Sequence, residues 1–209
     1  MRLGIMGGTF DPIHYGHLFI AEEARTRFRL QQILFIPNGE PPHKQNYQVT
    51  SASRRYSMAM IAIHGNPAFS CSPIEVERAG PSYAAETLVA IHDQQPHSEL
   101  FYITGIDAIS DVLNWHQHSE LFRLAKFIAA ARPGYPMELL KDRLPSNYLE
   151  RILPLVTTSP DISATEIRRR TLQNLTIRYL TPDGVVEYIH KHRLYRTDNI
   201  RTMPQQLKG

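Results

Sequence analysis

The chain has little cysteine and no long apolar run: Cys71 is the single cysteine among 209 residues. One cysteine excludes an internal disulfide and any metal site built mainly from thiolates, and it is typical of a reducing compartment. No segment approaches the ~20 apolar residues of a membrane-spanning helix, and no secretory signal precedes the first predicted strand. We therefore expect a cytoplasmic protein with no membrane partner.

Neither sign of charge dominates the chain. Lys and Arg number 23 against 20 Asp and Glu, which gives a net charge of +3 and a pI near 9.0. This balance suits an enzyme of anionic metabolites as well as a nucleic-acid binder. Because no motif combines aromatic and basic residues as RNA-binding modules do, we expect no nucleic-acid partner.

Two common glycine loops are also missing from the segment Gly7–His17. It has neither the Lys-Ser/Thr ending of a Walker loop nor the Gly-x-Gly-x-x-Gly of a dinucleotide fingerprint. What it has is a glycine pair, Gly7 and Gly8, directly after an apolar run, where the backbone could turn sharply and approach a ligand. Asp11 and Pro12 follow and are good residues for starting a helix.

Two histidines in the same segment define its chemistry. His14 and His17 are three residues apart and should project from one face of the first helical turn, where helical N–H groups favour an anion. They could also be surface residues or metal ligands, but a zinc site would need further Cys, His or carboxylate ligands, and the single Cys71 removes every thiolate-rich arrangement. An imidazole pair acting on phosphate is the interpretation that remains.

Apolar runs of strand and helix type alternate along the chain, which predicts an α/β fold: a Rossmann-like, doubly wound parallel sheet flanked by helices, with a C-terminal helical portion from about residue 163. We expect one domain over 1–195 and a polar, loosely held tail over 196–209. The expected strands are Leu3–Met6, Ile33–Ile36, Phe69–Val76, Leu100–Thr104, Phe127–Ala131 and Ile152–Val156. The expected helices span about Tyr15–Phe28, Ser51–His64, Tyr83–Asp93, Ser163–Gln173 and Asp183–His192, with two short ones across Ala108–Leu124.

Ligands of such sheets bind beyond the carboxyl ends of the strands, so the segments that follow predicted strands are where site residues are expected. Lys44, after Pro41 and Pro42, is a mobile charge suited to a phosphate or an ordinary surface lysine. Gly105 would let a nucleotide approach the backbone. Asp107 could accept bonds from a ribose, help hold a hydrated metal ion, or cap a helix that starts at Ala108.

Two further segments each allow a structural and a functional interpretation. On composition alone, Trp115, the only tryptophan, is expected to be a core residue, although its face could stack on an aromatic ligand. Ser163 and Glu166 have the spacing of a capping box. The same predicted helix start would also offer an anion site, with Thr165 and Arg168 on one side of the helix.

These segments together resemble a known family. Gly7–His17 is similar to the nucleotidyltransferase signature with its His-x-Gly-His motif, and Ser163–Arg168 is similar to the second signature, Ser-x-Thr-x-x-Arg. Between them, further motifs occur in the order found in bacterial nicotinate-nucleotide adenylyltransferases, and the resemblance extends from Met1 to about Tyr195. These motifs are Pro41–Lys44, Glu75–Arg78, Gly80–Tyr83, Thr104–Asp107 with Trp115, and Arg132–Tyr135.

The resemblance implies transfer of the adenylyl group of ATP to nicotinate mononucleotide in NAD biosynthesis, with Mg²⁺ bound to ATP and no direct protein ligands for the metal. It implies that His14 and His17 act on the α-phosphate and Lys44 and Arg168 on the β- and γ-phosphates. The other implied ATP-binding residues are Gly7, Gly8, Thr9, Phe10, Gly105, Asp107, Ser163 and Thr165. The implied residues for the mononucleotide are Thr9, His43, Lys44, Tyr83, Ala84, Ala85 and Trp115, the last stacking on the pyridine ring.

Two residues depart from the family pattern, and both belong to the implied pyridine pocket. Ala84 stands where the family usually has Thr, so the backbone N–H groups of Ala84 and Ala85 must serve the substrate carboxylate. His116 stands where an aromatic residue often follows the Trp. The alternatives are an adenylyltransferase of nicotinamide mononucleotide or phosphopantetheine, or a non-catalytic nucleotide sensor; a homo-oligomer is compatible with each.

Overall fold

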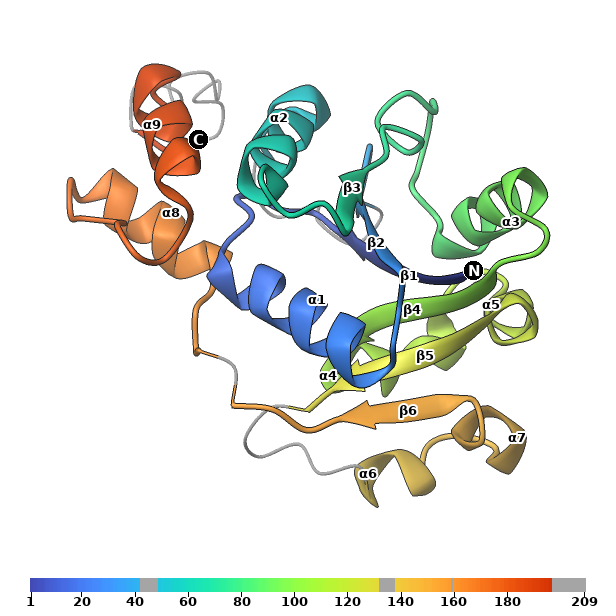
Figure 1. The fold of residues 1–209 in the computed structure, drawn as a ribbon. Coiled ribbons are helices and arrows are strands. Elements are labelled where there is room, and N and C mark those ends of the chain that lie inside the picture. The colour runs from blue at the N-terminus through green and yellow to red at the C-terminus, as the bar shows by residue number, and fades with distance from the viewer. Residues whose placement is uncertain (42–48, 132–137, 159, 197–209) are drawn as a thin grey trace, which may run out of the picture.

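The fold is built on six parallel strands in one sheet, in the order β3-β2-β1-β4-β5-β6 (Figure 1). The computed structural model describes residues 1–41, 49–131, 138–158 and 160–196. The strands are β1 (Arg2–Gly8), β2 (Gln32–Pro37), β3 (Phe69–Cys71), β4 (Glu99–Gly105), β5 (Ala125–Ala130) and β6 (Ile152–Leu155). The predicted doubly wound α/β class is confirmed.

Helices cover both faces of the sheet because neighbouring strand residues point to opposite sides. Phe101 and Ile103 of β4 belong to one buried cluster, whereas Leu100 and Tyr102 belong to the other. The first cluster lies under α1 (Tyr15–Arg27), α2 (Ala52–Ile63), α8 (Ala164–Leu172) and α9 (Asp183–Lys191). The second lies under α3 (Ala84–Gln94), α4 (Ile106–Ile109), the 3₁₀ helix η1 (Val112–Asn114), α5 (His118–Leu124), α6 (Glu138–Lys141) and α7 (Ser146–Leu149).

The strand order reverses at the centre of the sheet, and this reversal locates the site. β1 pairs with β2 on one side and with β4 on the other. The connections that leave β1 and β4 therefore run to opposite faces and leave a crevice between them at the carboxyl edge. None of the described helices combines the length and apolarity needed to span a membrane.

Three expectations about local structure were wrong. The strand predicted over 69–76 ends at Cys71, and Pro73, which lacks an N–H, follows in a turned segment. The helices α6 and α7 were not predicted, because at four residues each they are too short to show an amphipathic period. Asp11 and Pro12 do not start α1 but form a turn after Phe10, whose φ is 49°, and the helix begins at Tyr15, where its start was expected.

Candidate active site

The glycine pair serves packing, and the sharp turn comes after it. Gly7 and Gly8 lie within β1, paired with Ile36 and Pro37. A Cβ added at Gly7 would come within 2.7 Å of the Tyr102 hydroxyl oxygen, and one at Gly8 within 3.1 Å of the Phe10 ring. The prediction that these glycines form the turn was therefore wrong: they make room for two aromatic side chains beside the loop.

The two histidines meet at the N-terminus of α1, as their spacing predicts. His14 is the N-cap residue, and its ring stacks on that of His17 with centroids 3.7 Å apart and planes 27° apart. The backbone N–H of His14 donates to Nδ1 of His17 across 3.2 Å. In the neutral ring of His17 the proton is then on Nε2, which makes Nε2 the donor nitrogen of the ring.

The N-terminus of α8 lies beside that of α1. A Cβ added at Gly16 would be 3.6 Å from the carbonyl oxygen of Ile162. Nη1 of Arg168 donates to the carbonyl oxygen of Asp11 at 2.7 Å, and Nη2 donates to Oγ1 of Thr165 at 3.2 Å. The structure therefore brings together His14, His17, Thr165 and Arg168, from two helices more than a hundred residues apart, around two helix N-termini that favour anions.

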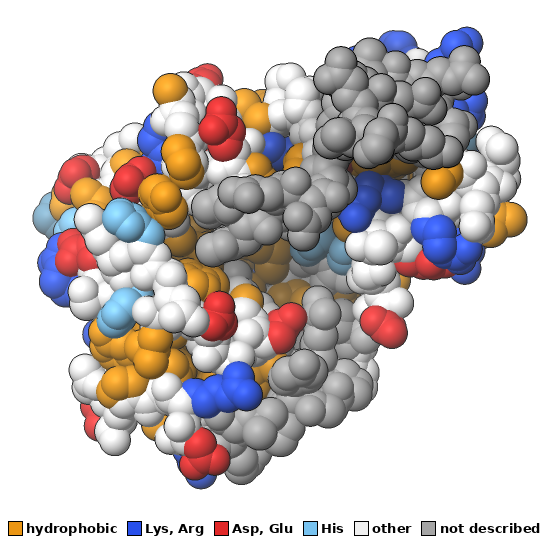
Figure 2. Space-filling view, turned by 180° about the vertical axis from the view of Figure 1, so that it is seen from behind, with side chains coloured by type: hydrophobic (Ala, Val, Ile, Leu, Met, Phe, Trp, Pro, Cys, Tyr) orange, Lys and Arg blue, Asp and Glu red, His pale blue; other side chains and the backbone are white. Residues whose placement is uncertain are grey.

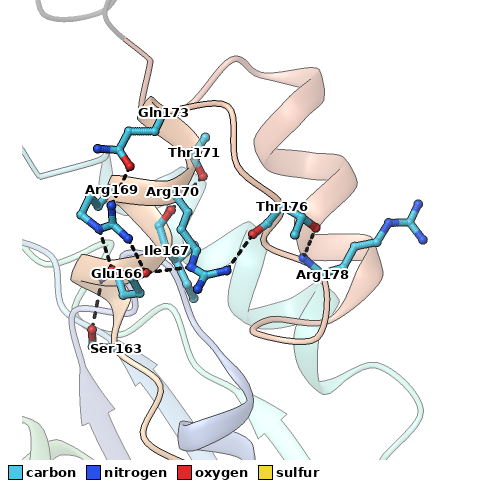
Figure 3. Close-up of polar contacts among 9 residues, drawn as sticks. All are labelled: Ser163, Glu166, Ile167, Arg169, Arg170, Thr171, Gln173, Thr176 and Arg178. Carbon is cyan, nitrogen blue, oxygen red and sulfur yellow. Dashed lines mark hydrogen bonds and ion pairs between the residues drawn. The ribbon is translucent and has the colours of Figure 1, made fainter.

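Half of the predicted capping box is present on α8. Oγ of Ser163 accepts the N–H of Glu166 at 3.2 Å, as expected. The Glu166 carboxylate instead accepts bonds from Arg169 and Arg170, at 2.7 Å for the shortest bond from each, as Figure 3 shows. Hydrogen bonds from Arg169 and then Arg170 lower the pKa of Glu166 to about 2. The predicted reciprocal bond, in which the Glu166 carboxylate would accept the Ser163 N–H, was wrong because two nearby guanidinium groups compete for this carboxylate.

Asp11 is the centre of a buried hydrogen-bond network behind the histidines. It is 2% exposed, and its carboxylate accepts the hydroxyl of Tyr195 at 2.7 Å and the N–H of Thr50 at 3.2 Å. Its main-chain carbonyl accepts Arg168, as described above. The loop after β1 is thus attached to three separate parts of the chain through one residue.

Arg55 of α2 connects the loop after β1 to the loop after β2. Its side chain is 1% exposed and donates to three main-chain carbonyl oxygens: those of Thr50 at 2.7 Å, Thr9 at 2.8 Å and Gly39 at 2.8 Å. Thr9 follows β1 and Gly39 follows β2, so one guanidinium sets the distance between two loops at the carboxyl edge. Arg55 was not predicted, since nothing in its sequence surroundings distinguishes it from a surface arginine of a helix.

A cavity of about 490 Å³ opens next to the loop after β1. Four of the residues that line it were predicted to contact the mononucleotide, namely Thr9, Tyr83, Ala84 and Trp115. The others are Asn38, Pro41, Glu75, Ser82, Tyr102, Asn114, His116 and Leu121. On the face that Figure 2 draws, the surface is hollowed near its centre, where hydrophobic and histidine side chains lie beside each other.

Aromatic side chains form much of the cavity wall. Trp115 is half-buried and meets Tyr102 edge-on with ring centroids 6.2 Å apart, so it is both a core residue and a wall residue. Burial raises the pKa of Tyr102 far above its usual value, which keeps its hydroxyl protonated. Tyr83 is the N-cap residue of α3 and packs on His116 with ring centroids 4.4 Å apart. Ala84 and Ala85 therefore occupy the first turn of α3, where backbone N–H groups have no partner within the helix.

A buried carboxylate braces another side of the cavity. Glu75 is 3% exposed and accepts the Asn38 amide at 2.8 Å and the Thr87 hydroxyl at 2.6 Å. Next to it, Oγ of Ser82 accepts the N–H of Gly39 at 2.9 Å. The Asn38–Glu75 and Gly39–Ser82 contacts join residues 37 and 43 positions apart, and the Thr87–Glu75 contact spans 12, so no local sequence pattern could have revealed them.

The remaining predicted residues divide into two groups. Gly105 ends β4 and is the N-cap residue of α4, and Asp107 is exposed in the first turn of α4. Asp107 therefore does not cap a helix at Ala108. His43, Lys44 and the segment 132–135 lie outside the described residues. Within the described ranges, no three His, Cys, Asp or Glu side chains gather closely enough to hold a metal ion.

The chain is similar in sequence to proteins of a known family. A family model for cytidylyltransferase-like proteins matches residues 5–170. A Corynebacterium kroppenstedtii protein named "Probable nicotinate-nucleotide adenylyltransferase" is 46% identical over 93% of this chain and 90% of its own. A Rubrobacter xylanophilus protein of the same name is 42% identical over 100% of this chain and 98% of its own.

Solved structures share the fold. The nicotinic acid mononucleotide adenylyltransferase of Plasmodium falciparum complexed with NaAD superposes with a TM-score of 0.73 at 18% identity, over 93% of this chain and 97% of that one. The same enzyme complexed with APC gives a TM-score of 0.71 over 93% and 96% of the two chains. From its sequence relatives, the chain belongs to the cytidylyltransferase-like family and, within it, to the nicotinate-nucleotide adenylyltransferases.

Proposed function

We propose that this protein transfers the adenylyl group of ATP to nicotinate mononucleotide, giving deamido-NAD and pyrophosphate. The observation that carries the proposal is the position of Thr9, which lies in the loop after β1 and also lines the 490 Å³ cavity. An acceptor in that cavity would present its phosphate to the loop that leads into the paired histidines at the start of α1. Both reacting phosphates would then meet at one edge of the sheet.

The chemistry needs little more than positioning and charge neutralisation. An oxygen of the acceptor's 5′-phosphate forms a bond to the α-phosphorus of ATP, and the bond from that phosphorus to the bridging oxygen of the β-phosphate breaks. The attacking oxygen is already anionic, so no general base has to remove a proton. Cationic and N–H donors that meet the charge developing on the α-phosphate lower the barrier.

On the ATP side, His14 and His17 are assigned to the α-phosphate, with Nε2 of His17 as a donor. Arg168, with Lys44, is assigned to the β- and γ-phosphates. Hydrogen bonds to ATP are added by Ser163 and Thr165 of α8 and by the loop residues Gly7, Gly8, Thr9 and Phe10. Gly105 and Asp107 would face the adenosine. The adjacency of the α1 and α8 N-termini supports these roles, because the backbone N–H groups at a helix N-terminus favour an anion.

On the acceptor side, Trp115 is assigned to the pyridine ring and the first turn of α3 to its carboxylate, through the N–H groups of Ala84 and Ala85. The lining of the cavity by Tyr83, Ala84 and Trp115 supports this orientation. Thr9, His43 and Lys44 would serve the acceptor phosphate. Mg²⁺ enters as part of the substrate MgATP, whose phosphate charge it reduces while keeping most of its water ligands.

We also propose one domain over residues 1–195 in the cytoplasm. Val185, Ile189 and Leu194 share a buried cluster with Met6 and Phe10, so the C-terminal helical portion and the start of the sheet are packed as one body. The single cysteine is typical of a protein in a reducing compartment such as the cytoplasm, which also contains ATP.

Release of pyrophosphate tests the function directly. The protein is supplied with ATP and Mg²⁺ and, in separate assays, with nicotinate mononucleotide, nicotinamide mononucleotide or phosphopantetheine. We expect the highest kcat/KM with nicotinate mononucleotide. A higher value with another acceptor would reassign the substrate, and no release with any of the three would leave a nucleotide sensor.

A further inference from the structure

We propose that Tyr195 is a positioning residue for adenylyl transfer: its hydroxyl holds Asp11 and, through Asp11, the loop that leads into His14 and His17. The inference rests on the proposed function, since it concerns how the phosphate-binding loop keeps its shape. Tyr195 lies 184 residues from Asp11 in the sequence and is no part of the substrate-binding set described above.

The first argument is the burial of the Asp11 carboxylate. At 2% exposure it has lost nearly all contact with solvent, and a buried carboxylate is costly unless donors replace the lost water. Tyr195 supplies the shorter of the two bonds to this carboxylate, at 2.7 Å against 3.2 Å for the Thr50 N–H. Burial raises the pKa of Tyr195 far above its usual value, so the hydroxyl stays a donor over the working pH range.

The second argument is what else depends on Asp11. Its carbonyl oxygen accepts Nη1 of Arg168 at 2.7 Å, and His14 follows it by three residues. A shift of Asp11 would therefore move the histidine pair and the Arg168 guanidinium relative to each other. Since misplacement of catalytic groups by about 1 Å can cost ~100-fold in rate, a bond that restrains Asp11 acts on catalysis without contacting substrate.

The third argument is the backbone around Tyr195. Tyr195 has a φ of 60° and Arg193 a φ of 50°, in the left-handed region that residues other than glycine rarely adopt. Such conformations persist where surrounding contacts determine them. Leu194, 3% exposed, packs into the core cluster that also contains Phe10, and Tyr195 packs against that cluster. The chain accepts an unfavourable backbone at the position where the hydroxyl reaches Asp11.

The test compares two tyrosine-to-phenylalanine variants in the full chain. Tyr195→Phe removes only the hydroxyl that Asp11 accepts. Tyr148→Phe is the matched control, because the Tyr148 hydroxyl lies 3.1 Å from Nδ1 of His118 on the opposite face of the sheet from α1 and α8. We expect Tyr195→Phe to lower kcat about five- to tenfold with both KM values within twofold, and Tyr148→Phe to leave kcat within twofold.

Thermal unfolding of both variants separates positioning from simple destabilisation. A Tyr195→Phe kcat within twofold of wild type would overturn the proposal, and so would a loss of kcat in Tyr148→Phe that matches it at equal change in Tm. If the wild type prefers another acceptor, the proposed substrate fails, and the same comparison is then made with that acceptor.

A double-mutant cycle with Asp11→Asn gives a second, independent readout. The amide keeps the size of the carboxylate but replaces one acceptor oxygen with a donor, so one of the two donors loses its partner. If Tyr195 acts through Asp11, the effects of the two substitutions on kcat should not add. The kcat of the double variant should then lie within twofold of that of the slower single variant. Multiplying effects would overturn the proposed route through Asp11.

Discussion

The His14 backbone N–H donates to Nδ1 of His17 while the rings of the two residues stack 3.7 Å apart. One bond therefore sets both the tautomer of His17 and the direction of its Nε2–H. Stacking restrains the ring further, so the imidazole is held in place before a phosphate arrives. Such preorganisation is what makes a hydrogen-bond donor effective on a developing charge.

His17→Ala should lower kcat more than tenfold with nicotinate mononucleotide, a loss of at least ~1.4 kcal/mol of transition-state stabilisation. His97→Ala is the control, because His97 is exposed just before β4, at the amino edge of the sheet. Pyrophosphate release measures both variants. Retention of more than a tenth of wild-type kcat in His17→Ala would remove His17 from the catalytic set.

Trp115→Ala should raise KM for nicotinate mononucleotide about tenfold and leave KM for ATP within twofold, since a stacking face is lost only on the acceptor side. The exposed neighbour Leu113 provides a control substitution, Leu113→Ala. Titration of each substrate at saturating levels of the other separates the two constants. An unchanged KM for the mononucleotide in a folded Trp115→Ala protein would assign Trp115 to the core alone.

Arg55→Lys should lower the free energy of unfolding by about 2 kcal/mol or more, because an ammonium cannot reach three carbonyl oxygens in the geometry of a guanidinium. We also expect KM for nicotinate mononucleotide to rise, since Thr9 lines the cavity and Asn38, which precedes Gly39, lines it too. Arg54→Lys, one residue earlier and exposed, is the matched control. Equal stability of the two variants in denaturant titrations would show that Arg55 does not join these loops.

Gly7→Ala should destabilise the protein by about 1–3 kcal/mol, because the new Cβ would lie 2.7 Å from the Tyr102 hydroxyl oxygen. The next nearest atom of that side chain, Cζ, would be 3.4 Å away, which is ordinary contact. Tyr102→Phe should therefore rescue most of the loss in the double variant. Denaturant unfolding measures the cycle, and additive losses would contradict the packing role of Gly7.

Glu166→Gln should lower Tm by about 1–3 °C at pH 7, the scale of exposed ion pairs. The folded pKa of Glu166 lies near 2, below its ordinary 4.5, so its stabilisation is complete above about pH 4.5 and is lost as the pH falls toward 2. The Tm difference between wild type and variant should shrink across that interval. Glu150→Gln, at an exposed position after α7, should show no such trend.

Alternating apolar runs were sufficient to predict the parallel sheet and most of its helices, because burial on both faces leaves a strong pattern in each strand. The meeting of His14 with His17 was predictable for a similar reason, since helical spacing is local. The bonds of Asp11 to Tyr195 and of Arg55 to Gly39 were not, because they depend on which loops the fold brings together. Gly7 was assigned to a turn because a sequence cannot show that an aromatic ring from a neighbouring strand occupies the space beside it.

The bonds from Arg55 to Thr50, Thr9 and Gly39 end on main-chain oxygens, which every amino acid carries. Because main-chain oxygens do not depend on residue type, the side chain at a bonded position can be exchanged without loss of that bond. At Gly39 this freedom ends, because a Cβ there would meet the Glu75 carbonyl oxygen. At Thr9 such an exchange is possible. Substitutions along the cavity wall can therefore alter acceptor preference while the bonds of Arg55 keep the distance between the loops unchanged.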